Sequence, residues 1–212
     1  VEWPGKIKGV KNLKKAWKEE EEEKVSAENL YGYSRYGGYL SQKSQATGFF
    51  RKEMKDGRWW LVDPDGYHFL SVGVCCINLS SGGGVKDLDK RMNMLKQLPP
   101  EKFIQTNRRG GRTADYSAWN LERRFGPDYE KAAIDLTIKR MDKWGVNTIG
   151  NWSDRRVEKS NRKAFTCTMH PAGVDSGLFG LGDPYEPRLD ERLEASLKPL
   201  MEGYRDNPWL IG

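Results

Sequence analysis

The alternation of apolar and polar residues is clearest between residues 48 and 68. Two apolar and aromatic runs flank the Lys-Asp-Gly-Arg segment at 55–58. Asp-Gly between such runs is a strong hairpin signal, because glycine accepts the positive φ of a type I′ turn. Residues 48–68 are therefore expected to form a β-hairpin, in which Trp59 and Trp60 serve packing and His68 is structural.

Further along the chain, apolar runs predict four strands. The run at 67–78 is nearly continuous, which favours a strand buried on both faces in a parallel sheet covered by helices. Shorter runs at 146–152, at 164–170 and from residue 209 predict the other three. We expect these strands to be mutually parallel.

Three segments have the composition or periodicity of helices. At 128–144 apolar residues recur at helical spacing, and Gly145 follows as a stop signal. Residues 189–204 also favour a helix, which Pro199 should kink or break. Residues 11–24 contain strong helix formers, but their lysines precede their glutamates, against the helix dipole. That segment predicts a short, exposed and marginal helix.

The order of these elements predicts an α/β fold. Strands that alternate with helices from residue 69 onward indicate a parallel architecture, and no phosphate-binding glycine motif follows any strand. A (β/α)8 barrel is therefore favoured over a doubly wound nucleotide-binding sheet. Such a barrel needs ~250 residues, so we expect the polypeptide to continue. The predicted domains are a helical and loop extension at 1–47, the hairpin at 48–68, and an incomplete barrel with about strands one to four at 69–212.

Composition and charge exclude some classes of partner. The formal net charge is +6, but it is spread along the chain, and its one dense cluster, at 108–112, is expected in a solvated loop. With no nucleic-acid motif, nucleic acid is not an expected partner. No apolar run approaches the ~20 residues of a membrane span, so no membrane partner is expected either.

The cysteines do not predict a metal or disulfide framework. Cys75, Cys76 and Cys167 are odd in number and lack C-x-x-C spacing. Because all three lie in apolar, strand-like runs, we expect buried free thiols. No metal and no cofactor is predicted.

Several segments resemble one family of enzymes. The stretch ATGFFRKEMKDGRWWLVDPDGYHFLSVGV (46–74) resembles the start of the catalytic barrel in β-agarases of glycoside hydrolase family 50. RMDKWGVNTIGNWSD (140–154) resembles their second βα unit, and DNPWLIG (206–212) resembles the opening of their fourth strand. The resemblance implies retaining hydrolysis of a β-glycosidic bond, in agarose or a related galactan, by two glutamates ~5–5.5 Å apart.

In these enzymes the two glutamates stand at the ends of strands four and seven, and neither strand end falls within the 212 residues. The resemblance therefore implies a chain with no catalytic residue of its own, which needs the C-terminal remainder of the barrel as a continuation or a second chain. A secreted or periplasmic location is expected, although residues 1–5 show no signal-peptide pattern. Two alternatives stay open: the same barrel acting on another β-glycan, and a non-catalytic carbohydrate-binding protein.

Candidate substrate-binding residues follow from the position of barrel sites at the C-terminal ends of strands. Polar side chains there can bind sugar hydroxyls, and an indole can stack on a sugar's C–H face. The candidates for binding a polysaccharide or oligosaccharide are Asn78, Asn151, Trp152, Asp154 and His170. The alternative for Asp154 is a helix N-cap, and for His170 it is a helix cap or a core position.

Overall fold

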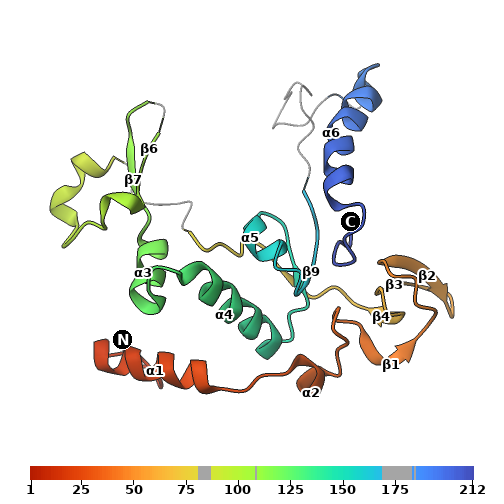
Figure 1. Cartoon of the computed structure of the whole chain (residues 1–212), viewed down its shortest axis with the longest axis horizontal. Coiled ribbons are helices and arrows are strands. Elements are labelled where there is room, and N and C mark those ends of the chain that lie inside the picture. Colours follow the sequence, from red (N-terminus) through yellow and green to blue (C-terminus); the bar gives the residue numbers. More distant parts are fainter. Residues whose placement is uncertain (81–86, 108, 169–182, 184) are drawn as a thin grey trace. The chain divides into compact units, whose positions relative to one another are not determined.

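A computed structural model gives the fold of the chain (Figure 1). It describes residues 1–80, 87–107, 109–168, 183 and 185–212. The chain divides into two compact units, each built from two separate stretches of sequence: residues 1–31 with 79–145, and residues 32–78 with 146–212. The three sequence-based domains stay predictions.

The first unit is mainly helical. Its elements are α1 (Val10–Glu22), α2 (Ala27–Tyr31), three 3₁₀ turns η1 (Leu88–Lys90), η2 (Met92–Met94) and η3 (Glu101–Phe103), the hairpin β6 (Ile104–Thr106) and β7 (Arg112–Ala114), α3 (Tyr116–Phe125) and α4 (Tyr129–Lys143). Helix α4 confirms the predicted periodicity, because Ala133, Leu136, Ile138 and Met141 are buried. Gly145 follows with φ +69°, as a helix stop should.

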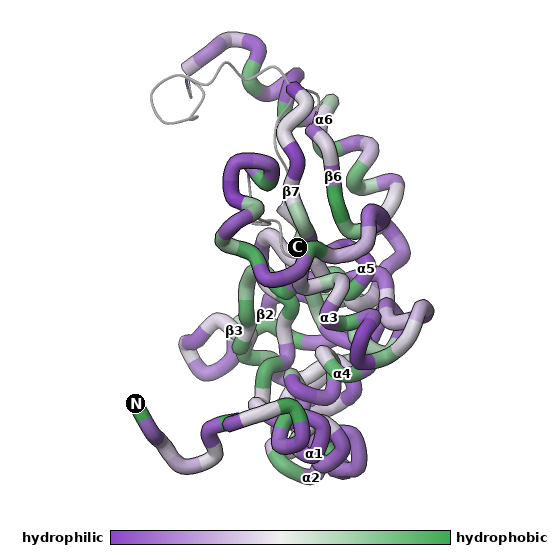
Figure 2. The backbone as a smooth tube through the Cα atoms, turned by 90° about the vertical axis from the view of Figure 1, so that its left-hand side faces the viewer, coloured by the Kyte–Doolittle hydropathy of each residue, from purple (hydrophilic) through white to green (hydrophobic). Residues whose placement is uncertain are grey.

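Helix α1 confirms the helix expected near residues 11–24. Its tube carries mostly hydrophilic colours (Figure 2), and none of its residues is buried. It is nevertheless not a free surface helix, because charged side chains of α3 and α4 hold it, as described below.

Arg112 lies on β7, at the base of the basic 108–112 segment. Its guanidinium contacts Glu101 Oε2 at 3.1 Å and Asp89 Oδ1 at 3.5 Å. These carboxylates offset the positive charge of Arg112, which makes this residue less suited to bind a polyanion such as nucleic acid.

An antiparallel sheet forms one part of the second unit. Its strands are β1 (Tyr39–Lys43), β2 (Arg51–Lys55), β3 (Arg58–Val62) and β4 (Tyr67–Phe69), in the order β1-β4-β3-β2. The predicted hairpin is confirmed: β2 pairs with β3, and both turn residues, Asp56 and Gly57, have positive φ (52° and 73°).

His68 is 1% exposed in this sheet, where the Trp60 ring lies 5.2 Å from its ring and Ser44 Oγ lies 3.0 Å from its Nε2. Its predicted structural role is confirmed. Trp59, in contrast, is 61% exposed, so packing accounts for Trp60 alone.

A parallel sheet forms the other part of the second unit. It consists of β5 (Gly73–Val74), β8 (Thr148–Ile149) and β9 (Ala164–Phe165), and Leu210 makes a parallel bridge to Phe165. The predicted parallel arrangement of the four segments is confirmed. Helices α5 (Arg155–Glu158) and α6 (Leu189–Tyr204) belong to the same unit, and α6 continues through Pro199 without a break.

The predicted continuous strand at 67–78 is wrong. The chain leaves the antiparallel sheet after Phe69, and only Gly73 and Val74 join the parallel sheet. Burial on both faces is wrong as well, since Val72 is 39% and Val74 43% exposed. The expectation of buried thiols fails for Cys75 and Cys76, which are exposed, while Cys167 is half-buried.

A buried amide joins these two sheets inside the second unit. Asn147 is fully buried; its Oδ1 accepts a bond from Val72 N (2.8 Å), and its Nδ2 donates to Gly37 O (3.0 Å) and Leu70 O (2.9 Å). Gly37 must be glycine here, since it has φ +94° and an added Cβ would lie 2.6 Å from Asn147 Cβ. Asn147 thus sets β5 beside β8 and positions the ends of both strands.

None of the described helices combines the length and the apolar character needed to cross a membrane.

Candidate substrate-binding site

The carboxyl ends of β5 and β8 form a joined edge, residues 75–78 and 150–154, which we call the rim. Parallel strands bring their carboxyl ends to the same side of a sheet, and main-chain bonds continue past the strands proper. These bonds are Gly150 N to Val74 O (2.8 Å), Cys76 N to Asn151 O (2.9 Å) and Asp154 N to Ile77 O (2.8 Å). These bonds bring residues 75–78 beside residues 150–154, and the substrate-binding role of Asn78, Asn151 and Trp152 stays a prediction.

Gly150 permits this close approach. A Cβ at that position would lie 2.9 Å from Cys75 Sγ and 3.0 Å from Val74 O. The first distance is shorter than real Cβ contacts and the second is tighter than most of them, so a larger residue would push the two halves of the rim apart.

Trp152 is the most unusual residue of the rim. Its φ is +59°, a left-handed conformation that costs a bulky residue roughly 1–2 kcal/mol. Its neighbours stabilise the turn: Asn151 Oδ1 accepts a bond from Trp152 N (3.0 Å), and Ser153 Oγ donates to Gly150 O (2.7 Å). The side chain is nevertheless 66% exposed. The strained turn therefore holds the indole of Trp152 in contact with solvent.

The two asparagines of the rim are polar groups of the kind that sugars need. Asn78 is exposed, and its Nδ2 donates to Cys76 O at 3.1 Å. Asn151 uses its Oδ1 within the turn, while its Nδ2 makes no hydrogen bond within the described residues. An acceptor such as a sugar hydroxyl can therefore use the Asn151 amide without breaking the turn.

Asp154 matches the structural alternative foreseen for it. It is the N-cap of α5, with Oδ1 accepting from Arg156 N (2.9 Å), and its Oδ2 lies 2.6 Å from Arg156 Nη2. It is the one carboxylate of the rim, and these contacts occupy it. A role for Asp154 in substrate binding stays a prediction.

His170 lies outside the described residues. Its place in the substrate-binding set therefore stays a prediction. In the described part of the chain, no group of three histidine, cysteine, aspartate or glutamate side chains is placed to hold a metal ion.

Glu158, on α5, is a buried acidic group that sequence reasoning missed. It is 7% exposed, and burial raises its pKa above the ordinary value; Arg155 opposes this rise and Asp154 adds to it. Burial and the charge of Glu158 also raise the pKa of Cys167, which follows β9. Because Glu158 lies in the charged stretch 153–162, nothing in the sequence marks it as buried.

Among the described residues, the rim holds a single carboxylate, that of Asp154. It offers one exposed indole, two amides and a carboxylate already paired with arginine, whereas retaining hydrolysis needs two carboxyl groups facing one bond.

The described residues form a mixed α/β chain, with an exposed indole and two asparagines at the carboxyl edge of its parallel strands. No family model matches the chain. β-Agarase B of Vibrio sp. (strain JT0107) is 30% identical over 255 aligned residues, which cover all of this chain and 26% of that protein.

Solved structures give the same answer. The agarase AgWH50C has 29% identity and a TM-score of 0.76, and the match covers 100% of this chain and 35% of that one. An exo-β-agarase has 25% identity and a TM-score of 0.74, with 36% of its chain covered. The resemblance to β-agarases is confirmed over the full chain, which spans between 26% and 36% of the length of these relatives.

Proposed function

We propose that this chain supplies part of the substrate-binding surface of a retaining (β/α)8-barrel glycoside hydrolase, which cleaves β-glycosidic bonds in agarose or a related galactan. One observation carries the proposal: a solvent-exposed Trp152, held in a left-handed conformation, at the carboxyl edge of parallel strands in a chain similar to β-agarases. The indole stacks on a sugar ring, and the amides of Asn151 and Asn78 bind its hydroxyls. His170 and Asp154 complete the proposed set.

The barrel assignment rests on the order of the parallel segments. Strands β5, β8 and β9 and the Leu210 bridge are neighbours in chain order and are separated by helices, as the first four strands of a barrel are. We assign 1–212 to the N-terminal portion of the enzyme. The C-terminal remainder, as a continuation or a second chain, then supplies the other strands, both catalytic glutamates and a cover for the exposed Val72 and Val74. A secreted or periplasmic location fits a polymeric substrate.

Binding of agaro-oligosaccharides, measured by calorimetry on the complete enzyme, tests the indole directly. Trp152→Ala should weaken binding by about 1–3 kcal/mol, by analogy with the loss of one stacked base. Trp59→Ala is the matched control, because Trp59 is similarly exposed (61% against 66%) but lies on the hairpin. Unchanged binding by Trp152→Ala, or an equal loss in both variants, would contradict the proposed site.

Catalysis is tested on the isolated chain. Residues 1–212 alone should not hydrolyse agarose or an aryl β-galactoside, and the C-terminal remainder should restore turnover. Residual activity that persists in 1–212 after contaminating enzyme is excluded would place the catalytic carboxylates within this chain and overturn the strand assignment.

A further inference from the structure

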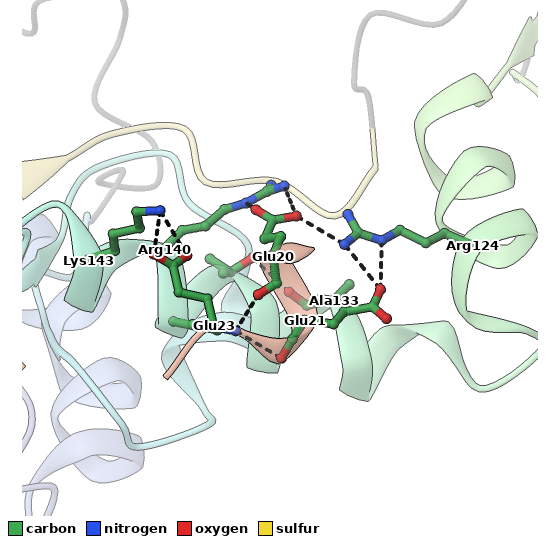
Figure 3. Close-up of polar contacts among 9 residues, drawn as sticks. Glu20, Glu21, Glu23, Arg124, Ala133, Arg140 and Lys143 are labelled. Carbon is green, nitrogen blue, oxygen red and sulfur yellow. Dashed lines mark hydrogen bonds and ion pairs between the residues drawn. The ribbon is translucent and has the colours of Figure 1, made fainter. Parts of the chain in front are cut away.

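Helix α1 is fastened to α3 and α4 by charge (Figure 3). Three glutamates at its C-terminal end each meet a cation from another helix. The contacts are Glu20 Oε1 to Arg140 Nε (2.7 Å), Glu20 Oε2 to Arg124 Nη2 (3.0 Å), Glu21 Oε1 to Arg124 Nη2 (3.2 Å) and Glu23 Oε1 to Lys143 Nζ (2.7 Å).

Arg124 is the centre of this network. Its side chain is 7% exposed, and its guanidinium lies 5.0 Å from the Trp17 ring and 4.7 Å from the Phe125 ring. A guanidinium so far removed from water needs carboxylate partners. Here α1 supplies both of them, Glu20 and Glu21, so the helix and the arginine depend on each other.

Lys139 on α4 adds a contact to the main chain of α1. Its ammonium donates to the carbonyl oxygens of Glu20 and Glu21. These belong to the last turn of α1, where the helix dipole favours a cation and where α1 has no basic residue of its own. Lys139 thus supplies, from α4, the cation that the C-terminal turn of α1 lacks.

Apolar contacts hold α1 much less firmly. Leu13, Ala16 and Trp17 are half-buried, and no residue of the helix is fully buried. A helix of 13 residues with clustered glutamates is marginal alone. The helix therefore exists because it is docked, and most of what docks it is electrostatic.

We propose that residues 10–23 form an ionic strap, which docks on and detaches from α3 and α4 as a unit, with ionic strength setting the balance. The Debye length falls from about 10 Å at 0.1 M salt to about 3 Å at 1 M, which weakens exposed pairs such as Glu23–Lys143. Proteins open locally in cooperative units, and units with few buried apolar contacts open most easily. The strap has this character, whereas α4 has a buried apolar face.

Hydrogen exchange of the intact chain at 0.1 M and 1 M NaCl tests the proposal. Exchange in peptides from 10–23 should rise about fivefold or more, the equivalent of roughly 1 kcal/mol. Peptides from 129–143 should keep their protection. Salt-independent exchange in 10–23 would overturn the strap, and so would a joint loss of protection in 10–23 and 129–143.

Charge variants separate the ionic contacts from general destabilisation. Glu20→Gln should raise exchange in 10–23 at 0.1 M salt and reduce the response to 1 M. Glu19→Gln is the matched control, because its carboxylate is 64% exposed and lies 3.6 Å from Lys15 of the same helix. Equal effects of the two variants would overturn the proposal.

A charge exchange provides a second, independent readout. Glu23→Lys and Lys143→Glu should each increase exchange in 10–23, and the double variant should return it toward the original rate. If the increases in exchange caused by the two single variants simply add in the double variant, the Glu23–Lys143 pair does not hold the strap.

Discussion

The two units of the chain join segments that are distant in sequence by opposite means. In the first unit, α1 meets α3 and α4 through ion pairs: the carboxylate of Glu20 and the guanidinium of Arg140 are partly open to water, and that of Arg124 is nearly buried. In the second, Asn147 joins the 37–72 segment to β8 through a neutral amide that is fully buried. A neutral amide can be dehydrated at modest cost when all its bonds are made, whereas a charge keeps a large penalty. We call these two sets of contacts the ionic joint (α1 with α3 and α4) and the buried joint (Asn147). Salt and pH should change the stability of the ionic joint, whereas only substitutions should change that of the buried joint.

Two glutamates show the same contrast at the level of single groups. Partial burial works to raise the pKa of Glu20, but hydrogen bonds and charges from Arg140 and Arg124 outweigh it and hold that pKa below its ordinary value. For Glu158, burial dominates, and its pKa is raised. The pKa values of these two glutamates therefore shift in opposite directions. Glu20 is hydrogen-bonded to two arginines, whereas only the charge of Arg155 opposes the effect of burial on Glu158.

The largest effect is expected at the buried joint. Asn147→Leu conserves size but leaves Val72 N and the carbonyl oxygens of Gly37 and Leu70 without their partner. Only the Gly37 contact is fully buried, and a buried unsatisfied group costs about 1–3 kcal/mol, so the free energy of unfolding should fall by about 2 kcal/mol or more. Urea titration measures this change in the free energy of unfolding.

The control is Asn120→Leu, on the exposed surface of α3. It should change the free energy of unfolding by about 0.5 kcal/mol or less. A similar result for both variants would show that the amide is not the joint.

Local patterns predicted the elements and missed both joints. The Asp-Gly turn, the periodicity before Gly145 and the apolar runs depend on neighbouring residues, and they gave the hairpin, α4 and the parallel strands. Asn147, in contrast, binds residues about 75 and 110 positions away, and the strap contacts span more than 100. No periodicity records such contacts. Apolarity at 67–78 likewise could not show that the chain changes sheets after Phe69.

The candidate site was predictable in part for a related reason. Position after a strand is a local property, so the placement of Asn78, Asn151 and Trp152 at the carboxyl ends of parallel strands could be predicted, and so could the N-cap alternative for Asp154. The left-handed φ of Trp152 could not, because nothing distinguishes it in sequence from an ordinary turn residue. Glu158 also escaped, because its burial depends on how the chain folds around a polar stretch.

A smaller effect is expected when the ionic joint is acidified. The folded pKa of Glu20 lies below its ordinary value, so its contribution to stability is present at neutral pH and is lost as pH falls through the ordinary value to the folded one. The cationic groups that face α1 from α3 and α4 are Arg124, Lys139, Arg140 and Lys143. Acid should therefore release α1 before the second unit unfolds.

Hydrogen exchange corrected for its intrinsic pH dependence measures this release in peptides 10–23. In Glu20→Gln the release should already be partial at pH 7 and change less with acid, by about 1 kcal/mol overall, the scale of one partly exposed ion pair. An acid response that is the same in the variant and the original chain would assign the release to other groups.

The smallest effect is expected at Glu158, and its sign is opposite. Because the folded pKa is raised, the folded state binds a proton more tightly than the unfolded state; that contribution to stability is present below the ordinary pKa and is lost as pH rises through the folded one. At pH 7, above the ordinary value, that contribution is reduced, and Glu158→Gln, which is neutral and similar in size, should raise the melting temperature slightly, the equivalent of no more than about 1 kcal/mol of stability. At pH 4, below the ordinary value, the gain should vanish. Calorimetric melting at both pH values distinguishes the two glutamates: a lower melting temperature for Glu158→Gln at pH 7 would mean that its carboxylate is held by favourable contacts, as that of Glu20 is, and the contrast between the two units would fail at this residue.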